Sequence, residues 1–195
     1  MTYSKEVFRK NEEWAKKTAN LREDFFKELS HGQKPDLLWI GCSDSRVSSS
    51  TIAGSELGQI FTLRNIANCI APDDINSMSV IQYAVHALGV KEIAVVGHTN
   101  CGGIKASKDI HDLSGPIKHW LEPVHQLYLE NLDEINVIEG ENNKLNHLCE
   151  LNVKRVADIV SKLEWVVAAK NSGNPVHIHG WIFNLEDGTL KDLKL

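Results

Sequence analysis

The chain has 195 residues, of which 42% are hydrophobic and 24% charged, a composition that fits one globular domain and excludes a disordered or collagen-like chain. The 21 Lys and Arg residues are outnumbered by 26 Asp and Glu, the net charge is −5, and no basic stripe is present, which excludes nucleic acid as a partner. No apolar run approaches the roughly 20 residues of a membrane span, and no apolar secretion signal opens the chain. We therefore expect a cytoplasmic protein with no membrane partner.

The first segment is predicted to be helical. Apolar residues recur at about helical spacing among charges over residues 5–29, which favours one or two amphipathic helices. The sequence HGQKP at residues 31–35 ends them, and residues 37–41 form a short apolar run typical of a buried strand. Cys42 follows this strand immediately.

A strand, a helix and a strand follow. Residues 59–63 predict the first strand of this series, and residues 75–88 predict a helix that ends at Gly89. Residues 91–97 predict the next strand, which leads directly to His98. A strand, helix and strand within about 30 residues form the βαβ unit, which requires parallel strands covered by helices.

The last third of the chain is predicted from apolar periodicity and turn residues. Helices are expected over residues 119–132, 142–149 and 152–170, and strands over residues 176–183 and 190–193. The fold class is therefore α/β, with a mainly parallel sheet of four to five strands covered by helices and an N-terminal helical arm.

Two short polar segments follow predicted strands at the point where each strand ends. They are CSDSR at residues 42–46 and HTNCGG at residues 98–103, and each follows an apolar run that ends in Gly. Because ligands of open parallel sheets bind beyond the carboxyl ends of the strands, neighbouring strands would bring both segments to one crevice.

Cys42, His98 and Cys101 form a candidate metal site. Two thiolates and an imidazole are a donor set that selects zinc, and three protein ligands leave the fourth tetrahedral position for water, substrate or Asp44. Since Cys42 lies far from the other two in the chain, the pattern favours a catalytic zinc ion over a zinc-ribbon staple.

Asp44 and Arg46 are two positions apart, so both side chains can face the same side as Cys42. Arg46 can hold a carboxylate ionised and orient it toward a metal-bound water. The residues alone leave two alternatives open: either Asp44 is itself a zinc ligand, or Asp44 and Arg46 form a loop ion pair with no catalytic role.

The other cysteines and histidines have weaker patterns. Cys69 and Cys149 have no ligand spacing and are expected to be buried packing residues. His177 and His179 alternate along a predicted strand and share one face, which makes them a minor candidate pair for a metal. The remaining histidines are expected at the surface or in packing contacts.

The segments C-x-D-x-R at residues 42–46 and H-x-x-C-G-G at residues 98–103 resemble the signature of the β-class carbonic anhydrases. The resemblance is close over residues 32–106 and returns over residues 151–190. It implies reversible hydration of carbon dioxide to bicarbonate and a proton by hydroxide on one zinc ion per chain. The implied zinc ligands are Cys42, His98 and Cys101. Asp44 and Arg46 would form a dyad that orients the hydroxide, and Asp44 would be a fourth zinc ligand in a closed state only.

The same resemblance implies a substrate pocket and a partner subunit. The implied pocket residues are Gln33, Phe61, Ile66, Tyr83 and Gly102. Since family sites lie at a subunit interface, Gln33, Phe61 and Tyr83 would serve the neighbouring chain. The chain would be one domain, residues 1–195, that forms a homodimer or a dimer of dimers, with residues 1–30 as an arm on the partner.

Relatives whose activity bicarbonate regulates use a tryptophan, an arginine and a tyrosine. Trp39 and Arg64 match, but the tyrosine position corresponds to Phe183, and without that hydroxyl the resemblance does not imply regulation.

The same residues allow three alternative functions to be compared with carbon dioxide hydration. Relatives in the family hydrolyse carbonyl sulfide or carbon disulfide, and the zinc ligands alone do not distinguish those substrates. A zinc-storage or thiol-redox protein is disfavoured because the chain has no CxxC motif. A nucleotide-binding domain is excluded because residues 97–102 hold neither GxGxxG nor a Walker lysine.

Overall fold

The computed structural model describes residues 2–195, which divide into two compact units, one ending at Lys34 and one formed by Pro35–Leu195. The first unit holds α1 (Tyr3–Leu21) and α2 (Phe25–Ser30), which confirms the helices predicted over residues 5–29. No residue of α1 is buried, and its apolar side chains Tyr3 and Phe8 are 81% and 69% exposed. The apolar stripe of α1 is therefore open to a binding partner.

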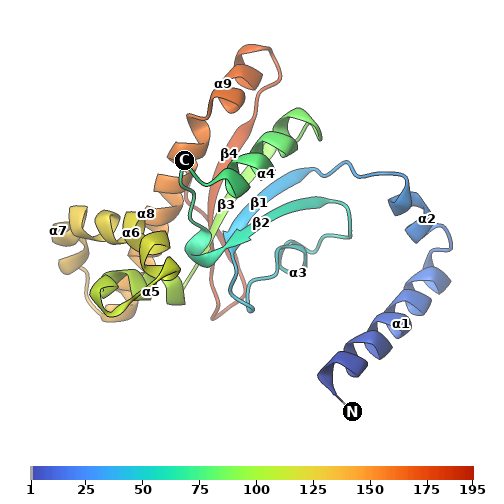
Figure 1. Cartoon of the computed structure of the whole chain (residues 1–195), viewed down its shortest axis with the longest axis horizontal. Coiled ribbons are helices and arrows are strands. Elements are labelled where there is room, and N and C mark those ends of the chain that lie inside the picture. The colour runs from blue at the N-terminus through green and yellow to red at the C-terminus, as the bar shows by residue number, and fades with distance from the viewer. Residues whose placement is uncertain (1) are drawn as a thin grey trace. The chain divides into compact units, whose positions relative to one another are not determined.

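The second unit is built on one five-stranded sheet with the order β2-β1-β3-β4-β5 (Figure 1). The strands are β1 (Leu37–Cys42), β2 (Ile60–Asn65), β3 (Glu92–His98), β4 (His177–Phe183) and β5 (Leu190–Asp192). β1 pairs in parallel with β2 and β3, β3 pairs in parallel with β4, and β5 returns antiparallel to β4. The predicted mainly parallel sheet is confirmed.

The alternation of side chains along the central strands separates two apolar clusters. Leu38 and Ile40 of β1 join the main core, whereas Trp39 between them points to the other face of the sheet. There Trp39 packs with Ala94 and Val96 of β3, and its ring meets the Trp181 ring edge-on at 6.2 Å. Both faces of the central strands β1 and β3 are therefore buried, as their continuous apolar runs predict.

The helices of this unit pack against the sheet and one another around the main core, except that Ile52 of the first of them packs against the Trp39 cluster. They are α3 (Ser49–Ala53), η1 (Ile66–Asn68), α4 (Ile75–His86), α5 (Gly102–Lys108), η2 (Ile110–Asp112), α6 (Pro116–Glu130), α7 (Leu132–Asn136), α8 (Glu141–Ser161) and α9 (Glu164–Asn171). Asp74 is the N-cap residue of α4, and its carboxylate accepts from the backbone N–H of Asn76. Within residues 2–195, no helix has the length and apolar character needed to cross a bilayer.

The boundaries predicted after residue 140 were wrong. Instead of helices over residues 142–149 and 152–170, one helix runs through from Glu141 to Ser161, and the break falls at Lys162 and Leu163. No helix breaker lies between Cys149 and Asn152, and the buried face continues through both residues. The break at Leu163 uses an extended backbone conformation with no Gly or Pro to mark it in the sequence.

Candidate metal centre

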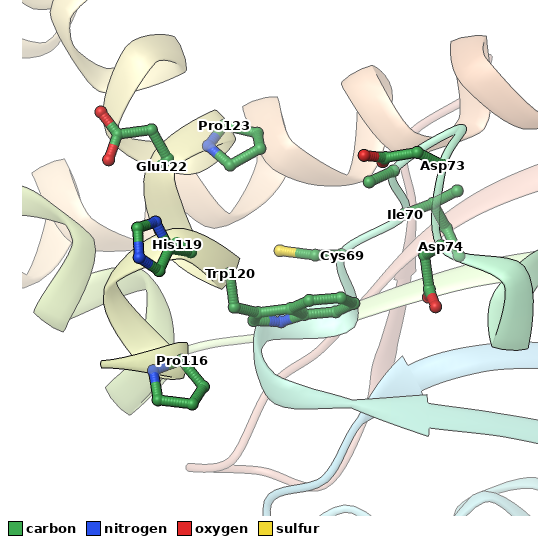
Figure 2. A pocket seen from close by; sticks show the side chains of 10 residues that line it. Cys69, Ile70, Asp73, Asp74, Pro116, His119, Trp120, Glu122 and Pro123 are labelled. Carbon is green, nitrogen blue, oxygen red and sulfur yellow. The ribbon is translucent and has the colours of Figure 1, made fainter. Parts of the chain in front are cut away.

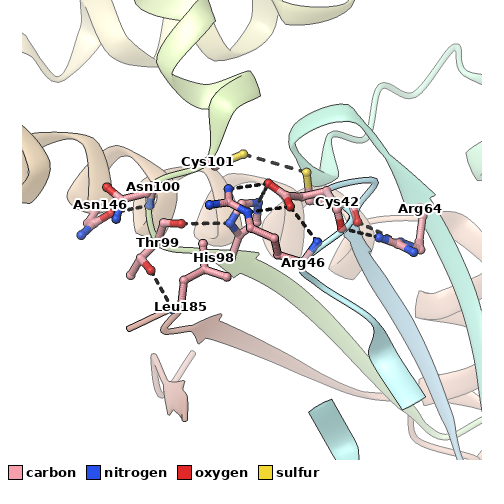
Figure 3. A network of polar contacts seen from close by, with 10 residues as sticks. Cys42, Arg46, Arg64, His98, Thr99, Asn100, Cys101, Asn146 and Leu185 are labelled. Carbon is pink, nitrogen blue, oxygen red and sulfur yellow. Dashed lines mark hydrogen bonds and ion pairs between the residues drawn. The ribbon is translucent and has the colours of Figure 1, made fainter. Parts of the chain in front are cut away.

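The two polar segments meet at the carboxyl ends of β1 and β3. Cys42 is the last residue of β1, His98 is the last residue of β3, and Cys101 is the N-cap residue of α5. Because β1 and β3 are adjacent and parallel, both ends lie on the same edge of the sheet, and Figure 3 shows their side chains converging there. The predicted convergence of residues 42–46 and 98–103 is confirmed.

The three predicted ligands form a compact, buried donor cluster. One nitrogen or sulfur atom from each of Cys42, His98 and Cys101 lies within 4.8 Å of the other two, and the two sulfur atoms are 3.9 Å apart. All three residues are at most 5% exposed. A tetrahedral zinc ion binds sulfur at about 2.3 Å and nitrogen at about 2.0 Å, so donors at these separations surround a space of the right size.

The His98 ring is oriented for metal binding. Its Nδ1 lies 2.9 Å from the carbonyl oxygen of Thr99, and since a carbonyl can only accept, Nδ1 carries the proton. Nε2 is then the unprotonated nitrogen, and this buried atom has no hydrogen-bond partner in residues 2–195. A buried lone pair without a partner is costly, and a metal ion at the cluster would satisfy it.

The two thiols of the cluster differ in protonation: Cys42 favours the thiolate, and Cys101 keeps its proton and donates it in a hydrogen bond. The Cys101 thiol beside the Cys42 sulfur lowers the pKa of Cys42, against the effect of burial. The pKa of Cys101 is raised, because its thiol donates to Cys42 and because it is itself buried. A divalent cation between the sulfurs would stabilise both thiolates, so the pair fits a metal ion.

Asp44 is clamped by Arg46 beside the donor cluster. The Arg46 Nε donates to Asp44 Oδ1 at 2.9 Å, and Arg46 Nη2 donates to Asp44 Oδ2 at 2.7 Å, a bidentate pair. These bonds hold the pKa of the Asp44 carboxyl well below its usual range, so Asp44 is anionic. Its Oδ2 lies 3.8 Å from His98 Nε2, which places the carboxylate at the mouth of the cluster.

Arg64 fixes the backbone of the same loop. Its Nε donates to the carbonyl oxygen of Cys42 at 2.9 Å, and its Nη2 donates to that of Asp44 at 2.7 Å. Arg64 lies on β2, next to β1 in the sheet, so its side chain crosses directly over the end of β1.

Phe183, which stands at the predicted position of a regulatory tyrosine, is buried at the end of β4.

The turn between His98 and Cys101 depends on residues that sequence reasoning missed. Asn100 adopts a left-handed conformation with φ 53°, and its backbone N–H donates to Asn146 Oδ1 at 2.8 Å. The Thr99 hydroxyl accepts from the backbone N–H of Leu185 at 3.0 Å. The sequence gives no local signal for Asn146, because it is a half-buried residue of α8 whose partner lies on another element.

The residues expected to line a substrate pocket fall into separate groups. Ile66 is 41% exposed and lines a hollow together with Ser43, Asn65 and Trp120. Phe61 and Tyr83 form a ring pair with centroids 6.0 Å apart, and Tyr83 is 51% exposed. A Cβ atom at Gly102 would have no neighbour within 4 Å.

Gln33 belongs to the N-terminal unit and is exposed there. Its predicted pocket role therefore stays a prediction.

The other candidate metal residues do not join the cluster. Cys69 and Cys149 are 3% and 2% exposed, and burial raises the pKa of each to about 12, so both are the neutral packing residues that the sequence predicted. His179 Nε2 donates to Glu92 Oε2 at 2.6 Å, and its ring stacks on Trp181. Among residues 2–195, only Cys42, His98 and Cys101 form a group of potential metal ligands.

The fold and the site define an α/β protein with a Cys–His–Cys candidate metal site at the carboxyl ends of its parallel strands. Residues 37–190 match the family described as carbonic anhydrase. A carbonic anhydrase of Emericella nidulans is 42% identical over 97% of this chain and 82% of its own, and one of Candida albicans is 39% identical over 90% and 62%.

Solved structures agree with the family match. A tetrameric β-carbonic anhydrase of Sordaria macrospora superposes with a TM-score of 0.94 at 34% identity, over 97% of this chain and 95% of that one. A β-carbonic anhydrase of Aspergillus fumigatus gives the same TM-score at 36% identity, over 99% of this chain and 91% of that one. The chain belongs to the β-class carbonic anhydrase family, and it is an enzyme of the carbonate dehydratase type.

Proposed function

We propose that Cys42, His98 and Cys101 hold one zinc ion per chain and that the enzyme hydrates carbon dioxide to bicarbonate and a proton at this site. The observation that carries the proposal is the buried His98 Nε2, which has no hydrogen-bond partner in residues 2–195 and lies in a cluster with two thiols. Zinc at this donor set would supply a Lewis acid that lowers the pKa of water and so provides a nucleophile near neutral pH.

Asp44 and Arg46 are proposed to orient the attacking water. Arg46 makes three hydrogen bonds to Asp44, two to Oδ1 and one to Oδ2. Oδ2 therefore keeps lone pairs that can accept from a water beside His98. A carboxylate with a lowered pKa is a weak base. We therefore assign Asp44 the role of a hydrogen-bond acceptor that fixes the water, and ligation of the metal by Asp44 becomes possible only when its bonds to Arg46 break.

Gln33, Phe61, Ile66, Tyr83 and Gly102 are proposed as pocket residues, with Gln33, Phe61 and Tyr83 serving the site of a partner subunit. The exposed apolar surface of Ile66 and Tyr83 supports contact with a second chain. So does α1, none of whose apolar residues is buried. We propose one catalytic domain with residues 1–30 as an exchanged arm, assembled as a homodimer or a dimer of dimers, in the cytoplasm.

The test is metal content combined with activity. We expect one zinc ion per chain by elemental analysis and rapid carbon dioxide hydration by stopped flow. Cys42→Ser should lose both, because zinc selects thiolate over hydroxyl. A zinc-loaded protein without hydration activity between pH 7 and 9 would refute the proposed reaction, and a metal-free active protein would refute the proposed site.

A further inference from the structure

The short turn η1, residues Ile66–Asn68, lies next to the donor cluster in an unfavourable backbone conformation. Ala67 has φ 61° and Asn68 has φ 44°, although neither residue is glycine. Both residues are at most 2% exposed. Left-handed residues with a Cβ atom are disfavoured and persist only where surrounding contacts hold them.

Two side chains from distant helices hold this turn by its carbonyl groups. Trp120 on α6 donates its indole Nε1–H to the carbonyl oxygen of Ile66 at 2.9 Å. Asn152 on α8 donates its Nδ2–H to the carbonyl oxygen of Ala67, also at 2.9 Å. Consecutive carbonyl groups of the strained turn are therefore each fixed by a side-chain N–H donor from a helix, and the Cys69 thiol also donates to the Ala67 carbonyl at 3.5 Å.

The orientation of the Asn152 amide is itself fixed. Arg155, one turn further along α8, donates from Nε and Nη2 to Asn152 Oδ1 at 3.2 and 3.0 Å. Because guanidinium groups only donate, Oδ1 must face Arg155 and Nδ2 must face Ala67. Asn152 is fully buried on the apolar face of α8, so its amide serves these two partners rather than water.

The η1 turn also contacts the elements that carry the donor cluster. The turn packs against β1, which ends at Cys42, and against β3, which ends at His98. A Cβ atom at Gly103, two residues after Cys101, would lie 2.8 Å from Ile66 Cγ2, so α5 and the turn are in close contact. Figure 2 shows the Trp120 ring reaching from α6 into the hollow that also contains Cys69, the residue that follows the turn.

We propose that Trp120 and Asn152 are positioning residues for the metal centre, which act by holding the Ile66 and Ala67 carbonyl groups so that the turn keeps its contacts with β1, which ends at Cys42, and with α5, which begins after Cys101. The inference rests on the proposed function in one respect, since it takes Cys42 as a zinc ligand. Neither residue touches the reacting atoms, so their effect reaches the metal only through the turn.

The experiment compares two variants with two matched controls. Trp120→Phe removes the indole N–H but keeps an aromatic ring, and Asn152→Asp replaces the donor by an oxygen of nearly the same shape that still faces Arg155. Trp165→Phe is the control for the first, because the buried Trp165 Nε1 has no hydrogen-bond partner in residues 2–195. Val160→Ala is the control for the second, because it removes buried volume from α8 away from the turn.

Three readouts separate positioning from general destabilisation. Amide hydrogen exchange of residues 66–69 reports the turn directly, the rate of zinc transfer to a chelator reports the centre, and the thiolate-to-cobalt absorption of Co²⁺-substituted protein reports the ligand geometry. Outer contacts of metal ligands are typically worth about 10–100-fold in metal affinity or activity. We expect exchange and zinc loss to accelerate about 10-fold or more in both variants, with a shifted cobalt band, and to stay within about two-fold of wild type in both controls.

Exchange and zinc loss in the variants that match those of the controls would overturn the inference. If Asn152→Asp does not fold, Trp120→Phe decides the case, because that change affects one half-buried N–H. Wild-type protein that binds no zinc would refute the proposed function instead, and the exchange of residues 66–69 would still show whether the two donors hold the turn.

Discussion

The sulfur atoms of Cys42 and Cys101 lie 3.9 Å apart, although 59 residues separate them in the chain. The sheet brings them together, because Cys42 ends β1 and Cys101 follows β3, its parallel neighbour. Two thiols at this distance cannot both ionise without a cation, and the raised pKa of Cys101 expresses that conflict. The rigid sheet therefore holds a pair of groups that only a bound cation can stabilise in its fully ionised form.

Removal of zinc should lower the thermal stability of the enzyme. A ligand present at 100 times its Kd stabilises a protein by about 2.7 kcal/mol, and 1 kcal/mol shifts the Tm of a chain of this length by about 2–4 °C. We therefore expect a strong chelator to lower the Tm in calorimetry by about 5–11 °C. Cys42→Ser should show the lower Tm without chelator and no further change with it.

Cys69→Ala is the matched control for this measurement. Cys69 is buried like Cys42 but lies outside the donor cluster. The change removes its weak thiol contact with the Ala67 carbonyl at 3.5 Å and leaves in place the Asn152 donor to that carbonyl and the hydrogen bond from Asn65 to the Cys69 backbone. The variant should keep one zinc ion and the full response to chelator. A chelator response missing from wild type, or lost equally in Cys69→Ala, would contradict the assignment of the ligands.

Replacement of Arg46 by Ala should reduce kcat/KM without shifting the pH profile near neutrality. Arg46 lowers the pKa of Asp44 through hydrogen bonds, so its loss raises that pKa toward the ordinary value of about 3.9. Asp44 stays ionised at pH 7, so the loss reflects orientation and is expected to be about 10–100-fold, the cost of removing an outer contact. A profile displaced into the range of pH 6–8 would show that Asp44 instead titrates during turnover.

The same pair gives a stability test with a defined sign. A carboxyl whose pKa is lower in the folded than in the unfolded state stabilises the fold above the unfolded pKa and loses that contribution as the pH falls. The difference in unfolding free energy between wild type and Arg46→Ala should therefore be present at pH 6 and shrink by pH 3. A difference that is independent of pH would mean that the pair contributes through packing alone.

Local sequence pattern was sufficient to predict the strands and the donor cluster. The apolar runs before Cys42 and His98 specify buried parallel strands, and parallel strands necessarily place their carboxyl ends at one edge. The roles of Trp120 and Asn152 could not be predicted, since each is the partner of a carbonyl group on a distant turn. Their hydrogen bonds exist only once α6 and α8 have packed.

The break between α8 and α9 was missed for a related reason. The apolar period continues through Leu163 into Val166, so hydrophobicity alone does not mark where the helix axis changes. Asn152 offered a clue, because a fully buried amide among Cys149 and Val153 needs a partner. A polar residue within an apolar stripe indicates a tertiary hydrogen bond but does not name its acceptor.

Gly102 and Gly103 should respond in opposite ways to substitution by Ala. A Cβ atom at Gly103 would lie 2.8 Å from Ile66 Cγ2 and 3.1 Å from Ala67 Cβ, whereas one at Gly102 has no neighbour within 4 Å. Overpacking typically costs about 1–3 kcal/mol, so Gly103→Ala should lower the free energy of unfolding by that amount. Gly102→Ala should leave it unchanged or raise it by about 0.4–1 kcal/mol, because Ala restricts the unfolded chain.

Denaturant titration of the two variants provides the measurement, with zinc content determined in parallel. If Gly103→Ala proved as stable as Gly102→Ala, the close contact between α5 and the turn would not exist in solution. Activity adds a further distinction, since Gly102→Ala extends into the proposed substrate pocket and is expected to raise KM while the fold stays intact.

The apolar face of α1 should be required for assembly. Phe8 is 69% exposed, an unusual position for a large aromatic ring unless a partner chain covers it. We expect wild type to sediment as a dimer or a dimer of dimers, and Phe8→Asp to dissociate it at micromolar concentration. The dissociated chain should also lose most of its kcat/KM, because Gln33, Phe61 and Tyr83 are proposed to complete the partner's site. Lys16→Ala, on the polar face of α1, should change neither property, and a fully active monomeric Phe8→Asp variant would show that each site is complete within one chain.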